Sequence, residues 1–190
     1  MVKILTAGDF HGDKNTARKL AEQAVKENAD IIILNGDIVE ENNIEGIMKY
    51  FAKTGKPIFL VPGNHDILAT DFLAEQYKAQ NINGKIIQYK NLAIIGCEGT
   101  QTEKEIYELI KKAKTQSQKT LLITHIHPAG TIMESFSQFV KGSTSLRKAI
   151  ERTKPDFVVC GHVHEAEGIE EKIGNTIVIN AGKKGRLIEL

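Results

Sequence analysis

The segment FLVPGNHDILA, residues 59–69, begins as a short apolar run and breaks into PGNHD at residues 62–66. A short apolar run bounded by turn residues is typical of a buried strand, and Pro, Gly, Asn and Asp are common in turns. The expected strand therefore ends in an adjacent amide, imidazole and carboxylate, which are groups that bind metals or move protons. One such cluster is weak evidence, so its meaning depends on how the other strands end.

Short runs rich in Ile, Val and Leu alternate with segments of helical periodicity along the chain. This alternation predicts an α/β fold in which strands are joined by helical crossovers. The expected strands are residues 2–7, 30–36, 58–61, 85–89, 91–97, 120–125 and 156–161. The expected helices cover about 14–27, 44–53, 71–79, 103–114 and 144–152.

Three further segments depart from this alternation. Residues 85–97 are expected to form a hairpin, so the sheet is not purely parallel. Residues 126–143 lack clean periodicity, and a loop of this length is usually functional, which makes it a candidate lid. The short runs in 165–190 suit antiparallel strands that close a second sheet. No linker or repeat marks a boundary, so we expect residues 1–190 to form one domain.

The composition excludes several classes of protein. The 25 basic and 24 acidic residues leave a formal charge of +1, which gives no reason to expect a stable nucleic-acid or membrane partner. No apolar run approaches the roughly 20 residues of a membrane span, and the first residues lead straight into a strand, so we expect a cytoplasmic chain. Cys97 and Cys160 each follow an apolar run and are expected to be buried thiols without a role.

Ligand-type residues follow five of the expected strands. Ligands of open α/β sheets bind beyond the carboxyl ends of the strands. In an extended backbone, D-F-H and H-V-H each present their first and third side chains on one side. A mixed set of carboxylates, imidazoles and one amide suits Mn, Fe, Zn, Ni or Co rather than Ca or Mg alone. Seven candidates exceed the needs of one ion and suit two ions that share a carboxylate. The strand ends are GDFHGD (8–13), NGD (35–37), PGNHD (62–66), His125 and GHVH (161–164).

In this order, the five blocks resemble the calcineurin-like metallophosphoesterase superfamily, whose pattern is D-x-H, G-D, G-N-H-D/E, a lone His and G-H-x-H. The second half of the chain is also similar to its small Icc-related predicted phosphoesterases. The resemblance implies a four-layer α-β-β-α sandwich of two mixed sheets flanked by helices. It also implies two divalent ions, with manganese first and Ni, Co, Fe, Zn or Mg as alternatives. The implied ligands are Asp9, His11 and His164 for one ion, Asn64, His125 and His162 for the other, and Asp37 as the bridge.

The resemblance also implies a chemistry, which is hydrolysis of phosphate esters by a hydroxide that bridges the two ions. His65 would face the substrate, and Asp66 would orient His65 or shape the loop. His127 matches no ligand position and is expected to be structural, whereas Phe136 and Phe139 could stack on a nucleobase or pin the loop to the core.

Departures from the family pattern narrow the range of expected substrates. The stretch GDIVEEN (36–42) lacks the Arg of protein phosphatases and the metal-binding Tyr of purple acid phosphatases. We expect a small phosphate-ester substrate, with phosphodiesters of small or nucleotide-like molecules preferred. The alternatives are a phosphomonoesterase of the same mechanism and a non-catalytic scaffold of the same fold. A nuclease subunit would need a basic groove, and a homo-oligomer is neither predicted nor excluded.

Overall fold

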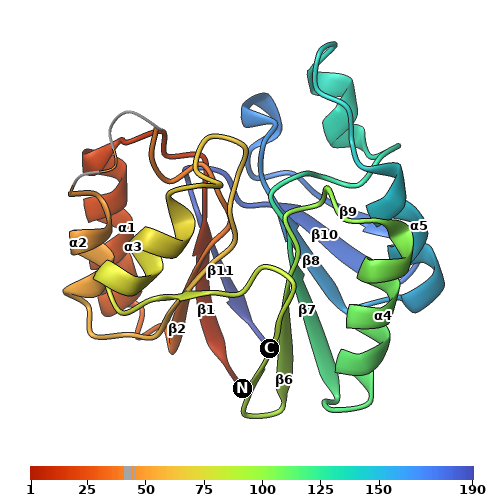
Figure 1. Ribbon diagram of the computed structural model, residues 1–190, viewed down its shortest axis with the longest axis horizontal. Coiled ribbons are helices and arrows are strands. Elements are labelled where there is room, and N and C mark those ends of the chain that lie inside the picture. The colour runs from red at the N-terminus through yellow and green to blue at the C-terminus, as the bar shows by residue number, and fades with distance from the viewer. Residues whose placement is uncertain (41–43, 45) are drawn as a thin grey trace.

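The computed structural model of the protein describes residues 1–40, 44 and 46–190. Its first sheet has five strands in the order β11-β1-β2-β3-β4, and its second has six in the order β5-β6-β7-β8-β10-β9 (Figure 1). The first-sheet strands are β1 (Lys3–Ala7), β2 (Ile31–Leu34), β3 (Ile58–Leu60), β4 (Gln80–Asn81) and β11 (Arg186–Glu189). The second sheet consists of β5 (Ile86–Tyr89), β6 (Leu92–Gly96), β7 (Lys119–Ile123), β8 (Phe157–Cys160), β9 (Glu170–Ile173) and β10 (Thr176–Asn180).

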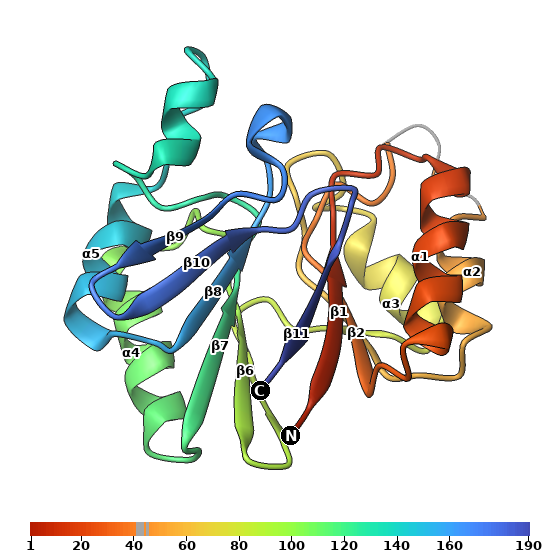
Figure 2. The same ribbon diagram turned by 180° about the vertical axis from the view of Figure 1, so that it is seen from behind.

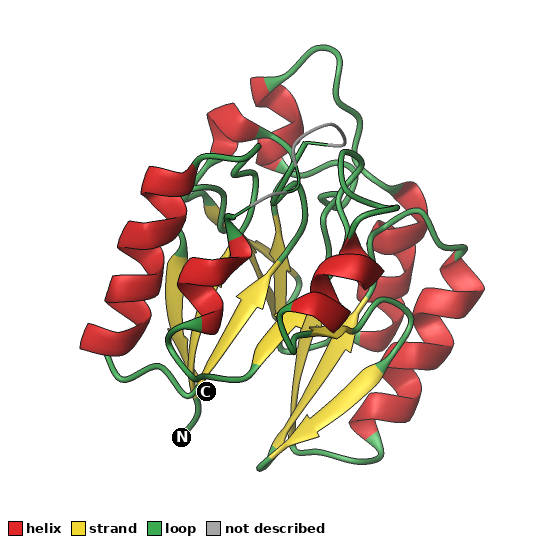
Figure 3. Cartoon of the chain, turned by 60° about the vertical axis from the view of Figure 1, so that its left-hand side comes forward, coloured by secondary structure: helices red, strands yellow, loops and turns green. Residues whose placement is uncertain are grey.

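Helices cover the outer face of each sheet, as Figure 3 shows. Asp13 caps the first helix by accepting hydrogen bonds from the Asn15 and Thr16 amides, and Thr102 and Glu105 form a capping box on the fourth. The helices are α1 (Lys14–Lys26), α2 (Met48–Ala52), α3 (Thr70–Gln76), α4 (Glu103–Lys114) and α5 (Thr144–Thr153), with 3-10 turns η1 (Ile132–Phe136) and η2 (His164–Ala166).

Alternating side chains of the strands divide the core into three layers. Leu5, Ile32 and Leu60 pack outward against the helices that cover the first sheet. Their strand neighbours, such as Ile4 and Ile33, pack between the two sheets. A third cluster joins the second sheet to α4 and α5. Because successive strand residues point to opposite faces, a strand buried on both faces must be apolar throughout, as IIIL in β2 is. The predicted four-layer α-β-β-α sandwich is confirmed.

The C-terminal run does not follow the prediction for the tail. β9 and β10 pair antiparallel at the edge of the second sheet, as expected. β11, however, crosses to the first sheet and pairs antiparallel with β1 (Figure 2). The prediction that the whole tail closes the second sheet is therefore wrong. Ile188 lies opposite Ile4 and is 6% exposed in the layer between the sheets. Burying that apolar side chain favours the crossing.

Other boundaries differ by a few residues. The antiparallel β5–β6 hairpin is confirmed. The helix predicted at about 44–53 is described from Met48 to Ala52. Residue 45, inside the predicted range, and residues 41–43, just before it, lie outside the described residues. The two polar residues of β4 carry no apolar pattern and were not predicted. The candidate lid, residues 126–143, contains η1. Across the described part of the chain, every helix is too short or too polar to cross a bilayer.

Candidate metal centre

The loops that follow β1, β2, β3, β7 and β8 converge where the carboxyl ends of the two sheets approach each other, at the top of Figure 1. Parallel pairing of β1 with β2 and β2 with β3 places the first three loops side by side. Parallel pairing of β7 with β8 does the same for the other two. Five segments that are distant in sequence therefore contribute side chains to one region, and this is the convergence that the strand ends predicted.

Asp9, His11 and His164 form the first cluster. One ligand atom from each of these side chains lies within 4.8 Å of the others. His11 Nε2 is 3.2 Å from His164 Nε2, which in turn is 3.8 Å from Asp9 Oδ1. Two imidazole nitrogens and a carboxylate oxygen that face one another at these distances suit a shared divalent ion.

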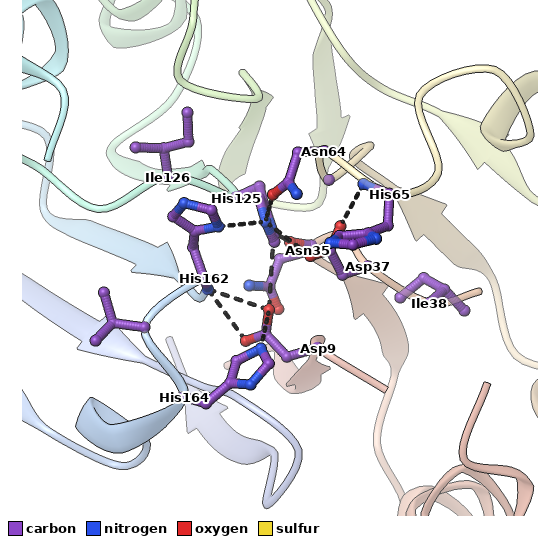
Figure 4. Close-up of polar contacts among 12 residues, drawn as sticks. Asp9, Asn35, Asp37, Ile38, Asn64, His65, His125, Ile126, His162 and His164 are labelled. Atoms are coloured by element: carbon purple, nitrogen blue, oxygen red, sulfur yellow. Dashed lines mark hydrogen bonds and ion pairs between the residues drawn. The ribbon is translucent and has the colours of Figure 1, made fainter. Parts of the chain in front are cut away.

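The second cluster forms around His125. Its Nε2 lies 3.1 Å from Asn64 Oδ1, 3.1 Å from His162 Nδ1 and 3.3 Å from Asp37 Oδ2 (Figure 4). The same oxygen of Asp37 is 3.7 Å from His11 Nε2 in the first cluster. Asp37 therefore lies between the two groups, at the position of a bridging carboxylate.

Local backbone strain coincides with these side chains. Asp9, His11, Asp37 and His162 have φ of 56°, 46°, 51° and 71°, in the left-handed region that residues other than glycine rarely adopt. Such conformations cost on the order of 1 to 3 kcal/mol each and tend to persist where function requires them. Four of the seven predicted ligands carry this strain, and the other described non-glycine residues with positive φ, Asn28, Lys78, Lys90 and Lys154, lie outside the cluster.

Backbone and second-layer hydrogen bonds fix the ligand atoms. The Asp9 carboxylate accepts hydrogen bonds from the His162 amide, at 3.1 Å to each oxygen, and Asp37 Oδ1 accepts one from the His65 amide at 2.9 Å. His125 Nδ1 lies 3.0 Å from the carbonyl oxygen of Asn35. If Nδ1 carries the proton and donates it to that carbonyl, Nε2 keeps a lone pair directed at the ligand cluster.

A close backbone approach at Gly63 completes the second cluster. A Cβ at this position would lie 2.1 Å from Asp37 Oδ1 and 2.4 Å from the Asp37 amide nitrogen. No side chain fits in that space, so the glycine of the GNHD block is required for Asp37 and the Asn64 loop to pack together.

Burial and neighbouring charges shift the pKa values of several groups in this site. Burial raises the pKa of Asp37, but the hydrogen bond and the charge of His125 outweigh it and hold the pKa at about 2. Asp9 is more deeply buried, and desolvation raises its pKa. Burial and the neighbouring His125 lower the pKa of His162 to about 4. A neutral imidazole and an ionised Asp37 are the forms that bind a metal cation.

The two remaining predicted site residues differ in environment. His65 is 44% exposed in its side chain, and its Nδ1 lies 3.3 Å from Glu40 Oε2, so it is accessible to a substrate. Asp66 is 1% exposed and accepts hydrogen bonds from the amides of Gly63, at 2.7 Å, and Ile38, at 2.6 Å. These contacts support the loop-shaping alternative for Asp66, because its carboxylate ties the β2 and β3 loops together.

Sequence reasoning missed two polar residues beside the cluster. Glu40 accepts a hydrogen bond from His11 Nδ1 at 2.7 Å while its other oxygen faces His65. A carboxylate three residues after Asp37 was the available signal. Asn35 is fully buried, and neither side-chain atom has a hydrogen-bond partner among the described residues. Its position in an apolar strand end gave no signal except its own polarity.

His127, predicted to be structural, is completely buried, and within the described part of the chain neither ring nitrogen has a hydrogen-bond partner. Burial lowers its pKa, so the neutral ring is favoured. It is absent from the three potential metal-binding groups found among the described residues.

The donor set fits two divalent ions. The nitrogen and oxygen atoms of each cluster already face one another, and Asp37 lies between them. The mixed donors match metals that accept both imidazole and carboxylate. A third group, His11, Glu40 and His65, shares His11 with the first cluster. Since its Glu40 contacts His11 through Nδ1 rather than through Nε2, we interpret Glu40 as a support for the ring.

Solved structures share this fold across nearly the whole chain. The protein TT1561 of Thermus thermophilus aligns with a TM-score of 0.72 and 16% identity over 98% of this chain and 97% of its own. A dimetal phosphatase from Danio rerio aligns with a TM-score of 0.70 and 10% identity over 94% of this chain and 86% of its own. An archaeal phosphodiesterase gives a TM-score of 0.58 and 19% identity over 100% of both chains. At these identities the comparisons establish similarity of fold alone.

Sequence comparison identifies the family. UPF0046 protein K07C11.7 of Caenorhabditis elegans is 39% identical over 71 residues, which are 36% of this chain and only 24% of that relative. Residues 2–166 match the calcineurin-like phosphoesterase family. That range includes all seven predicted metal ligands as well as His65 and Asp66. The chain therefore belongs to the calcineurin-like phosphoesterase family.

Proposed function

We propose that this protein is a metal-dependent phosphodiesterase that hydrolyses small phosphate diesters. The observation that carries the proposal is the position of Asp37 Oδ2, 3.3 Å from His125 Nε2 in one cluster and 3.7 Å from His11 Nε2 in the other. A carboxylate placed between two sets of nitrogen and oxygen donors is the arrangement that a dinuclear hydrolase requires. The names of two structural relatives, a dimetal phosphatase and a phosphodiesterase, are in keeping with it.

The proposed ligands divide as the clusters do. Asp9, His11 and His164 would hold one ion, Asn64, His125 and His162 the other, and Asp37 would touch both. Two divalent ions bound there would lower the pKa of water towards roughly 7 and neutralise charge on the phosphate oxygens. Manganese is the first metal to test. The donor set itself does not distinguish it from Ni, Co, Fe or Zn.

The chain's own groups would position the substrate and move a proton. The exposed His65 ring stands beside the clusters, 4.9 Å from the His11 ring, and Glu40 holds its Nδ1 side. In this orientation Nε2 is the nitrogen available to the substrate. During hydrolysis, water oxygen forms a bond to phosphorus, the ester P–O bond breaks, and the departing oxygen takes a proton. His65 can donate that proton or a hydrogen bond.

The charge of the site suits a phosphate ester but does not choose between a diester and a monoester. The carboxylates of Asp9, Asp37 and Glu40 lie within or against the clusters and would offset three of the four positive charges of two divalent ions. A diester carries one negative charge, whereas a monoester at neutral pH carries nearly two. The remaining positive charge attracts either ester, and because Coulomb attraction scales with the product of the charges, it does not by itself favour the diester.

The test compares bis(p-nitrophenyl) phosphate with p-nitrophenyl phosphate, using protein stripped of metal and reloaded with Mn, Ni, Co, Zn or Mg. Asp37→Asn removes the proposed bridge, and Asp71→Asn removes an exposed carboxylate of α3 as a matched control. We expect metal-dependent turnover that is faster with the diester, lost in Asp37→Asn and kept in Asp71→Asn. Faster monoester turnover would indicate a phosphomonoesterase, and metal binding without turnover of either substrate would indicate a scaffold.

A further inference from the structure

Asn35 is a buried polar residue that the proposed chemistry does not use. Its side chain is fully buried directly after the apolar strand β2, and among the described residues neither Oδ1 nor Nδ2 has a hydrogen-bond partner. The large majority of buried polar side-chain atoms are hydrogen-bonded, because a buried group without a partner loses its bonds to water and gains none. The unpaired amide of Asn35 therefore needs a physical explanation.

The backbone of Asn35 already contacts the second cluster. Its amide donates a hydrogen bond to the carbonyl oxygen of Ala7 at 3.0 Å, which holds the end of β2 against the end of β1. Its carbonyl oxygen lies 3.0 Å from His125 Nδ1. Figure 4 shows the residue between His125 and Asp9. The position of Asn35 is thus fixed next to one proposed metal ligand, and its side chain is directed at another.

The side-chain amide of Asn35 meets the Asp9 carboxylate beside Gly161. A Cβ at Gly161 would lie 2.9 Å from Asn35 Nδ2 and 2.6 Å from Asp9 Oδ2, and its nearest non-neighbouring atoms all belong to these two side chains. Nδ2 is a donor, and an ionised carboxylate is an acceptor. Since both atoms lie within hydrogen-bond reach of one point, a small movement of either side chain or one bridging water would join them.

Asp9 lacks a contact that distinguishes its two carboxylate oxygens. The His162 amide donates to Oδ1 and to Oδ2 at the same distance, 3.1 Å, so it does not select between them. Oδ1 is the oxygen that lies 3.8 Å from His164 Nε2, whereas Oδ2 is directed at Asn35. A donor on Oδ2 would keep Oδ1 turned towards the imidazoles. Hydrogen bonds to a ligating carboxylate commonly orient it in this way in metal sites.

We propose that Asn35 is a positioning residue of the first cluster: Nδ2 donates a hydrogen bond to Asp9 Oδ2, directly or through one water molecule, and leaves Asp9 Oδ1 to bind the ion. The proposal rests on the ligands assigned under the proposed function and goes beyond them, because Asn35 itself binds neither ion. It concerns one ion only, since a substitution of the side chain keeps the carbonyl oxygen that faces His125.

The test is Asn35→Val, which removes the donor and keeps a buried side chain, and the matched control is Thr6→Val. Thr6 is also fully buried, in the neighbouring strand β1, and its Oγ1 has no hydrogen-bond partner in the described part of the chain. Metal-free proteins are titrated with Mn²⁺ in a calorimeter. Asn35→Val should bind one ion about 10- to 100-fold more weakly and the other with unchanged affinity. Thr6→Val should bind both ions as the wild type does.

Urea denaturation of the metal-free proteins separates positioning from a purely structural role. A buried amide without a partner contributes little to stability, so its replacement by an apolar side chain is expected to be nearly neutral or stabilising. Asn35→Val should therefore unfold at the urea concentration of the wild type or above it, although it binds Mn²⁺ more weakly. Wild-type affinity for both ions in Asn35→Val, or an equal loss for both, would overturn the proposal.

A crystal structure of the Mn²⁺-loaded wild type tests the same contact without any variant. We expect Asn35 Nδ2 to lie within hydrogen-bond distance of Asp9 Oδ2 or to share one ordered water with it, and an Nδ2 that does neither would overturn the proposal. Failure of the proposed function would be visible separately, as wild-type protein that binds two ions but hydrolyses no phosphate ester. The comparison of Mn²⁺ affinities does not depend on turnover and would still decide the role of Asn35.

Discussion

Replacing Gly161 by alanine should damage the first metal cluster by displacing one carboxylate. A Cβ at Gly161 would lie 2.6 Å from Asp9 Oδ2 and 2.9 Å from Asn35 Nδ2. Ordinary contacts begin at 3.4 Å, so the carboxylate oxygen would have to move by about 0.8 Å. Asp9 also accepts two hydrogen bonds from the His162 amide, and such a movement would disturb both.

We expect two measurable effects of Gly161→Ala. Overpacking of this kind lowers the free energy of unfolding by about 1 to 3 kcal/mol. Displacement of a metal ligand from its position lowers affinity by about 10- to 100-fold, the range seen when groups that orient ligands are removed. Calorimetric titration of metal-free protein with Mn²⁺ measures the affinity, and urea denaturation of the metal-free protein measures the stability.

Gly142→Ala is a matched control for the steric effect. A Cβ there would lie 2.6 Å from the backbone of Ala129, in the 126–143 segment. It should also destabilise the fold, but the Mn²⁺ affinity of the folded protein should remain that of the wild type. If Gly161→Ala binds two ions with wild-type affinity, the assignment of Asp9 as a ligand in this geometry is refuted.

Three further predictions concern groups around the cluster. Asp66→Ala leaves two buried amides without an acceptor, at a cost of about 1 to 3 kcal/mol for each amide. Urea denaturation should therefore show a free energy of unfolding that is lower by roughly 2 to 6 kcal/mol. A loss below about 0.5 kcal/mol would contradict the loop-shaping role of Asp66. His162 should make the metal-free protein lose thermal stability as the pH falls from about 6.5 to about 4, because unfolded His162 takes up a proton before the buried ring does, whereas His125, whose pKa Asp37 raises despite burial, contributes in the opposite direction. The decline should be smaller in His162→Gln, and a pH dependence of the melting temperature identical to that of the wild type would contradict the role of His162. Glu40→Ala removes the partner of His11 and His65 and should lower kcat/KM for bis(p-nitrophenyl) phosphate by about 10- to 100-fold, whereas wild-type kinetics would show that Glu40 supports neither ring.

The sequence predicted most of the strands and helices because each carries its own signal, whereas the four-layer arrangement was implied by the family resemblance. β2 is apolar at every position and is buried on both faces, and α1 repeats buried residues at helical spacing. β4 is too short and too polar to produce such a pattern. The pairing of β11 with β1 depends on contacts between residues far apart in sequence, which periodicity within a segment does not encode.

The candidate site was predictable where a residue type and its place in a strand end both pointed to metal binding. The structure brings together all seven residues that the sequence selected as ligands. Glu40 was not selected because acidic residues are common in loops, and only its position beside His65 distinguishes it. Asp and His adopt the left-handed region more often than most residues other than glycine, but residue type alone did not indicate that Asp9, His11, Asp37 and His162 do so.

A crystal structure of the Mn²⁺-loaded protein, with anomalous scattering recorded at the manganese edge, would show whether these side chains bind two ions bridged by Asp37. We expect two anomalous peaks about 3.5 to 4 Å apart. One should lie against Asp9, His11 and His164, the other should lie against Asn64, His125 and His162, and Asp37 should contact both. A single peak, or two peaks that do not share Asp37, would rule out a dinuclear centre bridged by Asp37.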